Sequence, residues 1–253
     1  FVKLFSVENV SDLHNSIEIF CQAMMYRDID IREYILDSSK EEYPLLKVLS
    51  EKLQNSNDSA VIGQIIDIFR RLLDTDNIDS LWRRKEEFLS IVYKFWFPTY
   101  ILPALLDNDL SPSKCTLKGQ LFDLISFCMT RHGSRARSFI TSNNILELIE
   151  EPNLKGPGFL KLSVIRLFKR VAGDKDRKIE RYLMSKNLFD PIMDVFRENS
   201  DRYNMVNSAV IDLFNFIDTE KYNNFRIIGY LVERFRKDFE NITYVNTFTQ
   251  LIK

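Results

Sequence analysis

A short pattern of apolar and polar residues recurs five times along the chain, each time within a stretch whose apolar positions have helical spacing. Each copy is a tetrad: an apolar residue, a polar residue, a second apolar residue, and then Phe or Ile. The first residues of the copies lie 49, 56, 43 and 46 positions apart. The pattern predicts an all-α chain built from repeated groups of helices. The five tetrads are Ile17–Phe20, Ile66–Phe69, Phe122–Ile125, Ile165–Phe168 and Ile211–Phe214.

Two of these groups align with each other without a gap. Residues 121–146 fall over residues 164–189 at a constant offset of 43. Each copy has a long helix, a loop, a short aromatic helix, a polar turn with Asn and an amphipathic helix, predicted over 145–149 and 188–196. This order is typical of armadillo and HEAT repeats, which are about 40–47 residues long. We therefore predict one armadillo/HEAT-like helical repeat solenoid of about five repeat units over residues 1–253, with an enlarged interval at about 74–116.

Helix breakers fall where this scheme needs them. Pro152 and residues 156–158 interrupt the helical pattern between the third and fourth repeats. Four other prolines are predicted at or near helix starts or turns, because Pro lacks a backbone N–H and fits the first turn of a helix. They are Pro44, Pro98, Pro103 and Pro191.

The polar position of the tetrad predicts a ladder of side chains along one surface. It holds Glu18, Asp67, Asp123, Arg166 and Asp212, and one turn later the same face carries Cys21, Arg70, Ser126, Lys169 and Asn215. A mostly acidic ladder disfavours a nucleic-acid groove, which needs Lys and Arg to neutralise phosphates. The alternative is pairing within each helix, for example between Asp67 and Arg70 or Arg71.

Basic residues gather in two loops that the offset of 43 or 44 makes equivalent. Because guanidinium groups bind carboxylates and phosphates, these loops predict a site for an acidic or phosphorylated peptide. The alternative is ordinary charged surface. The basic residues are Arg131, Arg135 and Arg137 in one loop, and Lys175, Arg177, Lys178 and Arg181 in the other.

Composition narrows the classes of function. With 35 basic and 36 acidic residues the net charge is close to zero, so nothing draws the whole chain to nucleic acid or membrane. The two histidines and three cysteines have no metal-ligand spacing, and no phosphate loop or nucleophile elbow is present. No apolar run reaches the roughly 18 residues of a membrane span. We expect a segment of a longer intracellular protein, with no catalytic residues, metal or cofactor.

The last tetrad lies within the run RYNMVNSAVIDLFNFI at residues 202–217. This run resembles the Arg-Tyr-Asn, Asn-Ser-Ala and Leu-Phe-x-Phe-Ile signature of the SMEK family, regulatory subunit 3 of protein phosphatase 4. Residues 181–183, 187–189 and 244–248 are also similar to the family. The resemblance is dense from about Leu117 to the end and thinner from Phe1 to Leu110.

The resemblance implies the central armadillo-like domain of a noncatalytic phosphatase subunit. The family also has an N-terminal EVH1-like domain, which binds short proline-containing motifs, and a low-complexity C-terminal tail; we expect neither in this chain. The resemblance further implies association with the phosphatase 4 catalytic subunit, a second regulatory subunit, and substrate or adaptor proteins. It implies a location in nucleus and cytoplasm and nuclear targets that include DNA-damage checkpoint proteins. Relatives often carry a longer insert where this chain has the brief loop 107–114.

The helix predicted over 203–217 is the first candidate for a partner-binding surface. Its apolar positions predict core, and its amide side chains suit the backbone of an extended peptide, although Asn207 could instead cap or bridge helices. The leading hypothesis is a scaffold for protein partners; the alternatives are a helical-repeat nucleic-acid-binding protein and an unrecognised enzyme. The candidate partner-binding residues are Arg202, Tyr203, Asn204, Asn207, Asp212 and Asn215, together with Arg135, Arg137, Arg177 and Lys178.

Overall fold

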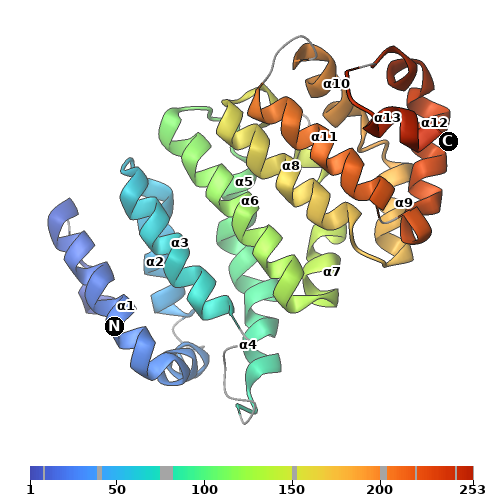
Figure 1. The fold of residues 1–253 in the computed structure, drawn as a ribbon. Helices are drawn as coiled ribbons and strands as arrows, with labels where there is room; N and C mark the ends of the chain where they lie inside the picture. The colour runs from blue at the N-terminus through green and yellow to red at the C-terminus, as the bar shows by residue number, and fades with distance from the viewer. Residues whose placement is uncertain are drawn as a thin grey trace. The chain divides into compact units, whose positions relative to one another are not determined.

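The computed structural model describes residues 1–7, 9–38, 42–74, 82–149, 153–199, 204–219, 221–242 and 244–252 (Figure 1). The described residues form helices, turns and loops and contain no strand, so the predicted all-α class is confirmed. They fall into two compact units, unit 1 from Phe1 to Ala136 and unit 2 from Arg137 to Lys253. The single repeat domain over residues 1–253 stays a prediction.

Unit 1 is built around three long helices, α1, α3 and α6, that lie side by side (Figure 1). Helix α3 packs against both α1 and α6, and α2 contacts α3, α6 and the π-helix η3. A short helix, α7 (Ser134–Ser142), crosses from unit 1 into unit 2. The elements of unit 1 are η1 (Val2–Phe5), α1 (Val10–Asp37), α2 (Pro44–Asn55), α3 (Ser59–Leu73), α4 (Lys85–Ile91), η3 (Val92–Ile101), α5 (Leu102–Leu106) and α6 (Pro112–His132).

Unit 2 is centred on α11, which lies along α8 and also contacts α10, α12 and α13 (Figure 1). Its elements are η4 (Glu147–Ile149), η5 (Asn153–Lys155), α8 (Gly158–Ala172), α9 (Arg177–Ser185), α10 (Asp190–Asn199), α11 (Met205–Thr219), α12 (Lys221–Asn241) and α13 (Thr247–Ile252).

Each of the five tetrads lies in a helix, in α1, α3, α6, α8 and α11 respectively. The last residue of every tetrad is buried, as predicted for a core position. The third residue is buried in four tetrads, whereas Ile19 in α1 is 57% exposed. The recurring apolar positions therefore form the cores of the two units. The buried last residues are Phe20, Phe69, Ile125, Phe168 and Phe214.

The two aligned repeats end their short helices in the same turn. Asn144 follows α7 with a φ of 51°, and Asn187 follows α9 with a φ of 52°. Asn tolerates this left-handed conformation better than most residues. The N–H of the next residue donates to a carbonyl five residues back in both turns, at 3.0 and 3.1 Å. The predicted Asn turns are confirmed, but after Asn144 the structure describes only the short η4, where a helix over 145–149 was predicted.

Pro98 departs from the prediction. It lies inside η3 rather than at a helix start, and the helix runs without a break from Lys85 to Leu106. A π-helix pairs residues five apart and occurs as a local bulge in α-helices. Widening of the helix relieves the clash that the Pro ring would otherwise make with the preceding turn. By contrast, Pro44 and Pro191 lie in first helical turns as predicted. Pro103 lies inside the same continuous helix as Pro98, and Pro152 falls outside the described residues.

The same continuous helix, Lys85–Leu106, is long and apolar enough to cross a membrane by length and composition alone. No such segment was expected, because charged residues and Pro98 divide the sequence into shorter apolar runs. Core helices pass the same test, and here Phe88, Trp96 and Phe97 are fully buried. The ring of Trp96 packs edge-on against Phe69 of α3, with 4.6 Å between centroids. Packing within unit 1 accounts for these three side chains, and 33% of the apolar window is buried.

Candidate functional site

The first turn of α11 uses its polar side chains for contacts within the protein. The Asn204 side-chain oxygen accepts a hydrogen bond from the backbone N–H of Asn207 at 2.8 Å, which caps the start of the helix. Asn207 is 6% exposed, and its amide group donates to the hydroxyl of Tyr244 at 3.3 Å. Within the part of the chain that the structure describes, its buried side-chain oxygen has no hydrogen-bond partner. Asn207 thus bridges α11 to the α12–α13 connection, one of the two roles foreseen for it; Arg202 and Tyr203 lie outside the described residues.

The later turns of α11 reach solvent but are also engaged. Asp212 forms an ion pair with Lys169 of α8, with 2.6 Å between the amine nitrogen and a carboxylate oxygen. The Asp212 side chain is 65% exposed. Asn215 is exposed, and its side-chain oxygen accepts a hydrogen bond from the Thr247 hydroxyl at 2.5 Å. Two asparagines of α11 therefore bind the protein's own chain, Asn207 at Tyr244 before α13 and Asn215 at Thr247, the first residue of α13. Among the candidate residues of α11 that the structure describes, Asp212 and Asn215 are exposed to solvent.

The basic residues of the first loop are paired with carboxylates. Arg135 forms an ion pair with Glu86 at the start of α4. Arg137 lies 3.0 Å from the carboxylate of Asp174 and 3.4 Å from that of Asp176. These neighbouring carboxylates offset part of the positive charge that the sequence predicted for this loop. The side chains of Arg135 and Arg137 are about one-third exposed, at 34% and 29%.

The basic residues of the second loop are more accessible. Arg177 and Lys178 begin α9, are exposed, and have no ion pair within the described residues. The backbone N–H of Lys178 donates to the Asp176 carboxylate at 2.7 Å, so the helix start is already capped. Because Arg135 belongs to unit 1 and the second loop to unit 2, the predicted joint patch stays a prediction. Arg177 and Lys178 are therefore accessible cations of unit 2.

The tetrad ladder contains the pairing within a helix that the sequence left open, and also a pair between helices that was not predicted. In α3, Asp67 lies 3.6 Å from Arg70, three residues along the same helix. In unit 2, the Lys169–Asp212 pair instead joins two neighbouring helices, and the Lys169 amine also lies 5.2 Å from the ring centroid of Phe216. The ladder is therefore a surface of mutually paired charges in these helices.

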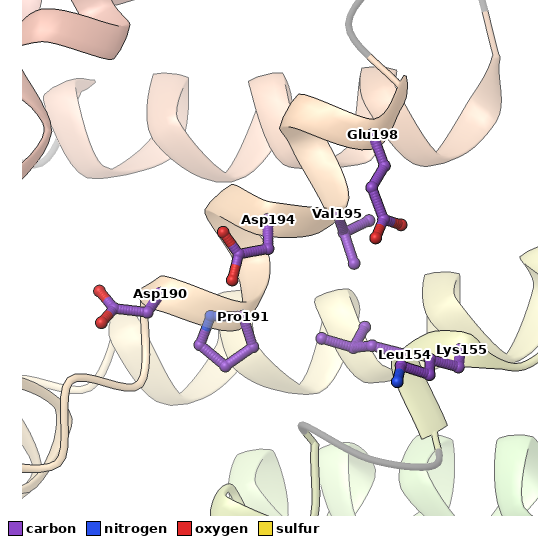
Figure 2. Close-up of a pocket in the computed structure, with 7 residues that line it drawn as sticks. All are labelled: Leu154, Lys155, Asp190, Pro191, Asp194, Val195 and Glu198. Atoms are coloured by element: carbon purple, nitrogen blue, oxygen red, sulfur yellow. The ribbon is translucent and has the colours of Figure 1, made fainter.

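A groove that was not predicted from the sequence lies on unit 2 between α10 and η5 (Figure 2). Its volume is about 330 Å³. On α10 the lining residues recur every three to four positions, which places them on one helix face. The sequence shows that the acidic residues of this face recur every four positions, but it does not show that the face lies beside η5. The lining residues are Leu154, Lys155, Asp190, Pro191, Asp194, Val195 and Glu198.

The buried titratable groups are parts of the core. The imidazole Nε2 of His132 lies 2.7 Å from the Leu73 carbonyl oxygen, and Nδ1 lies 2.7 Å from the Tyr93 hydroxyl. Burial raises the pKa of the Cys128 thiol to about 12, so the reactive thiolate is disfavoured. Within the described residues, no group of three His, Cys, Asp or Glu side chains could hold a metal ion.

Comparisons with known proteins identify relatives along nearly the whole chain. The sequence profile of the family described as phosphatase 4 regulatory subunit 3 matches residues 3–253. The serine/threonine-protein phosphatase 4 regulatory subunit 3 of Drosophila melanogaster is 29% identical over 93% of this chain and 25% of its own length. Suppressor of Mek1 of Dictyostelium discoideum is 28% identical over 97% of this chain and 25% of its own length. Protein PPP4R3C1 of Mus musculus is 29% identical over 93% of this chain and 31% of its own length.

These matches place the chain in a class of regulatory, noncatalytic phosphatase subunits. The chain belongs to the phosphatase 4 regulatory subunit 3 family, which confirms the resemblance found in residues 202–217. The expectation that it is not an enzyme follows from the family and is confirmed. The chain spans about a quarter to a third of the length of these relatives. No solved structure matches it.

Proposed function

We propose that this chain is a scaffold region through which a phosphatase 4 regulatory subunit holds the catalytic subunit, a second regulatory subunit, or substrate and adaptor proteins. The observation that carries this proposal is the family match over residues 3–253. In this role the chain directs dephosphorylation without taking part in the chemistry. Its targets would include DNA-damage checkpoint proteins, and it would act in nucleus and cytoplasm.

The proposed architecture is an armadillo/HEAT-like solenoid of about five repeat units. Three observations support it: the tetrads all lie in helices, their last residues are buried, and the turns at Asn144 and Asn187 share one geometry. Solenoids expose long surfaces for partners, because each repeat packs only against its neighbours. This architecture suits a subunit that binds several proteins at once.

The proposed contact with an acidic or phosphorylated partner is centred on α9. Arg177 and Lys178 are exposed and unpaired within the described residues, whereas Arg135 and Arg137 already face carboxylates. A guanidinium and an ammonium in one helical turn can bind a carboxylate or phosphate. Asp212 and Asn215 on α11 supply a second, polar contact surface in the same unit.

A binding experiment with purified proteins tests the proposal. The chain is immobilised and incubated with the phosphatase 4 catalytic subunit, with and without the second regulatory subunit, and retained protein is quantified. We expect retention of the assembly, reduced about three- to tenfold by the pair Arg177→Glu and Lys178→Glu. The control pair Lys3→Glu and Lys237→Glu makes the same charge change at exposed lysines elsewhere and should leave retention unchanged.

Two outcomes would contradict the proposal in different ways. Absence of any retained phosphatase subunit would contradict the scaffold role, whereas retention that the α9 pair leaves unchanged would contradict only the α9 contact. Binding to RNA or DNA that falls steeply with salt would instead favour the nucleic-acid alternative. Circular dichroism of each variant verifies that the helices are intact.

A further inference from the structure

The groove between α10 and η5 combines a small apolar floor with an acidic rim. Leu154 and Val195 are buried at its base, each with 4% of its surface exposed. Val195 and Glu198 point from α10 toward the side on which Leu154 and Lys155 lie, and the Asp190 carboxylate points away from them (Figure 2). A volume of about 330 Å³ is at the lower end of ligand pockets, so it suits one or two side chains of a larger partner.

The carboxylates of the groove differ in how far they are already neutralised. Asp190 forms a two-point ion pair with Arg234 of α12. Glu198 is exposed and has no ion pair within the described residues. Lys155, the cation among the lining residues, has an interaction of its own. Because Asp190 and Asp194 already face arginines, Glu198 is the lining carboxylate that gives the groove its negative charge.

Asp194 can accept a second cation at low cost. Its carboxylate lies 2.5 Å from Arg197, and its side chain is 63% exposed. Arg197 also binds both carboxylate oxygens of Asp238, at 3.0 and 2.8 Å. If Asp194 turns toward a ligand, Arg197 keeps its two-point pair with Asp238. Asp194 and Glu198 lie one helical turn apart on the same face of α10, so one cation can contact both.

We propose that this groove docks an arginine-bearing segment of a partner protein. The guanidinium lies between Asp194 and Glu198, because its planar fork can bind two carboxylates at once. The aliphatic part of the arginine packs against Pro191 and the small exposed parts of Leu154 and Val195, as long basic side chains do over apolar surface. The groove is negatively charged and is formed by α10 and η5, whereas the first turn of α9 is positively charged. Unit 2 would therefore carry one docking site for a cation and another for an anion.

The charge of the groove decides the class of partner. An acidic or phosphorylated segment would place like charges beside Asp194 and Glu198, which is unfavourable. A purely apolar segment would cover Leu154 and Val195 but leave the carboxylate of Glu198 without a partner. A single exposed ion pair contributes about 0.2–1 kcal/mol, so the groove acts as one contact within a larger interface.

Peptide binding to the whole 253-residue chain tests the proposal. The probes are acetyl-Leu-Arg-Leu-amide and the same peptide with citrulline, which keeps the shape of arginine but lacks its charge. Binding is followed by the backbone amide signals in NMR spectra. We expect the arginine peptide to shift signals of α10 and η5 and to bind about three- to tenfold more tightly than the citrulline peptide.

Matched variants complete the test. The pair Asp194→Asn and Glu198→Gln should remove the preference for arginine, whereas Asp12→Asn with Glu233→Gln, at exposed carboxylates elsewhere, should preserve it. Equal binding of the two peptides, shifts confined to other surfaces, or a preference that survives in the groove variant would overturn the proposal. No phosphatase is present in this experiment, so its failure leaves the proposed scaffold role to its own test.

Discussion

Unit 1 and unit 2 differ in the side chains that bind their buried backbone groups. In unit 1 the carbonyl groups at the end of α3 are bound by Arg32 from α1 and His132 from α6. Lys118, fully buried in α6, binds the loop that follows α5, and desolvation lowers the pKa of its amine. The last carbonyls of a helix have no partner within the helix. Unit 1 satisfies several of them with desolvated cationic or imidazole side chains.

Unit 2 relies on neutral polar groups and on aromatic packing. Its buried polar side chains, within the described residues, are Asn153, Ser163, Asn207 and Thr247. Four phenylalanine rings from α10, α11, α12 and α13 pack with centroids 5.0–5.6 Å apart. The difference teaches that helices with the same tetrad can bury cationic side chains in one unit and, within the described residues, only neutral polar side chains in the other. The four rings are those of Phe196, Phe214, Phe239 and Phe248.

The largest expected effect comes from removing a buried cation of unit 1. Arg32 is 1% exposed and donates to the carbonyls of Leu72 and Arg71 at 3.0 and 2.7 Å. Arg32→Met keeps most of the apolar volume but leaves two carbonyls without a partner. We expect the free energy of unfolding to fall by about 2–4 kcal/mol. Urea unfolding followed by tryptophan fluorescence measures this, because both tryptophans, Trp82 and Trp96, lie in unit 1.

A control on the same helix separates burial from charge. Arg27 is 75% exposed and lies 3.6 Å from Asp30. Because surface ion pairs contribute little, Arg27→Met should change the unfolding free energy by less than about 0.5 kcal/mol. Equal effects of the two substitutions would contradict the contrast between units, since the buried contacts of Arg32 would then contribute no more than an exposed pair.

A smaller change in the free energy of unfolding is expected from raising the pH. The group responsible lies in unit 1, which contains all three cysteines. Burial raises the pKa of Cys128 from 9.0 to about 12. The folded value lies above the unfolded one, so this contribution to stability is complete below pH 9 and is lost as pH rises toward 12. At about pH 10.5 the loss should be about 1–2 kcal/mol relative to pH 8. Tryptophan-detected urea unfolding at the two pH values measures it.

The variant Cys128→Ala isolates this thiol from other groups that titrate at high pH. Its own unfolding free energy should fall less between pH 8 and about pH 10.5 than that of the unchanged chain. The comparison uses the change with pH, so a constant cost of the small cavity left by the substitution cancels. Parallel pH dependences in the two proteins would show that the Cys128 thiol is not the group responsible.

Local and periodic features were predictable from the sequence. The tetrads marked the helices that carry the core, and the offset of 43 found the turns at Asn144 and Asn187. Pro98 was placed wrongly because a local rule for proline does not include the π-helix around it. The rule describes an α-helix, whereas η3 has a different hydrogen-bond register.

Features that join distant segments were not predictable. Whether Arg135 is accessible depends on Glu86, which lies 49 residues earlier in the chain. The sequence offered Asn215 to an extended peptide and left Asn207 open between a peptide contact and a bridge between helices. Their side chains bind Tyr244 and Thr247 of the same chain, and the sequence does not name these partners. The groove of α10 likewise needs η5 beside it. One sequence gives the chemical types of these side chains but not which carboxylate or carbonyl lies opposite each.

The smallest expected effect concerns two residues with positive φ, for which the two units use different residue types. Unit 1 places Glu42 before α2 with a φ of 56°, whereas unit 2 uses Asn144 at 51°. Asn is favoured over Glu in this left-handed region. Glu42→Asn should therefore stabilise the chain by about 0.5–1 kcal/mol, and Asn144→Glu should destabilise it by a similar amount. Urea unfolding monitored by circular dichroism measures both, and changes of the same sign would show that residue type at these turns does not determine their strain.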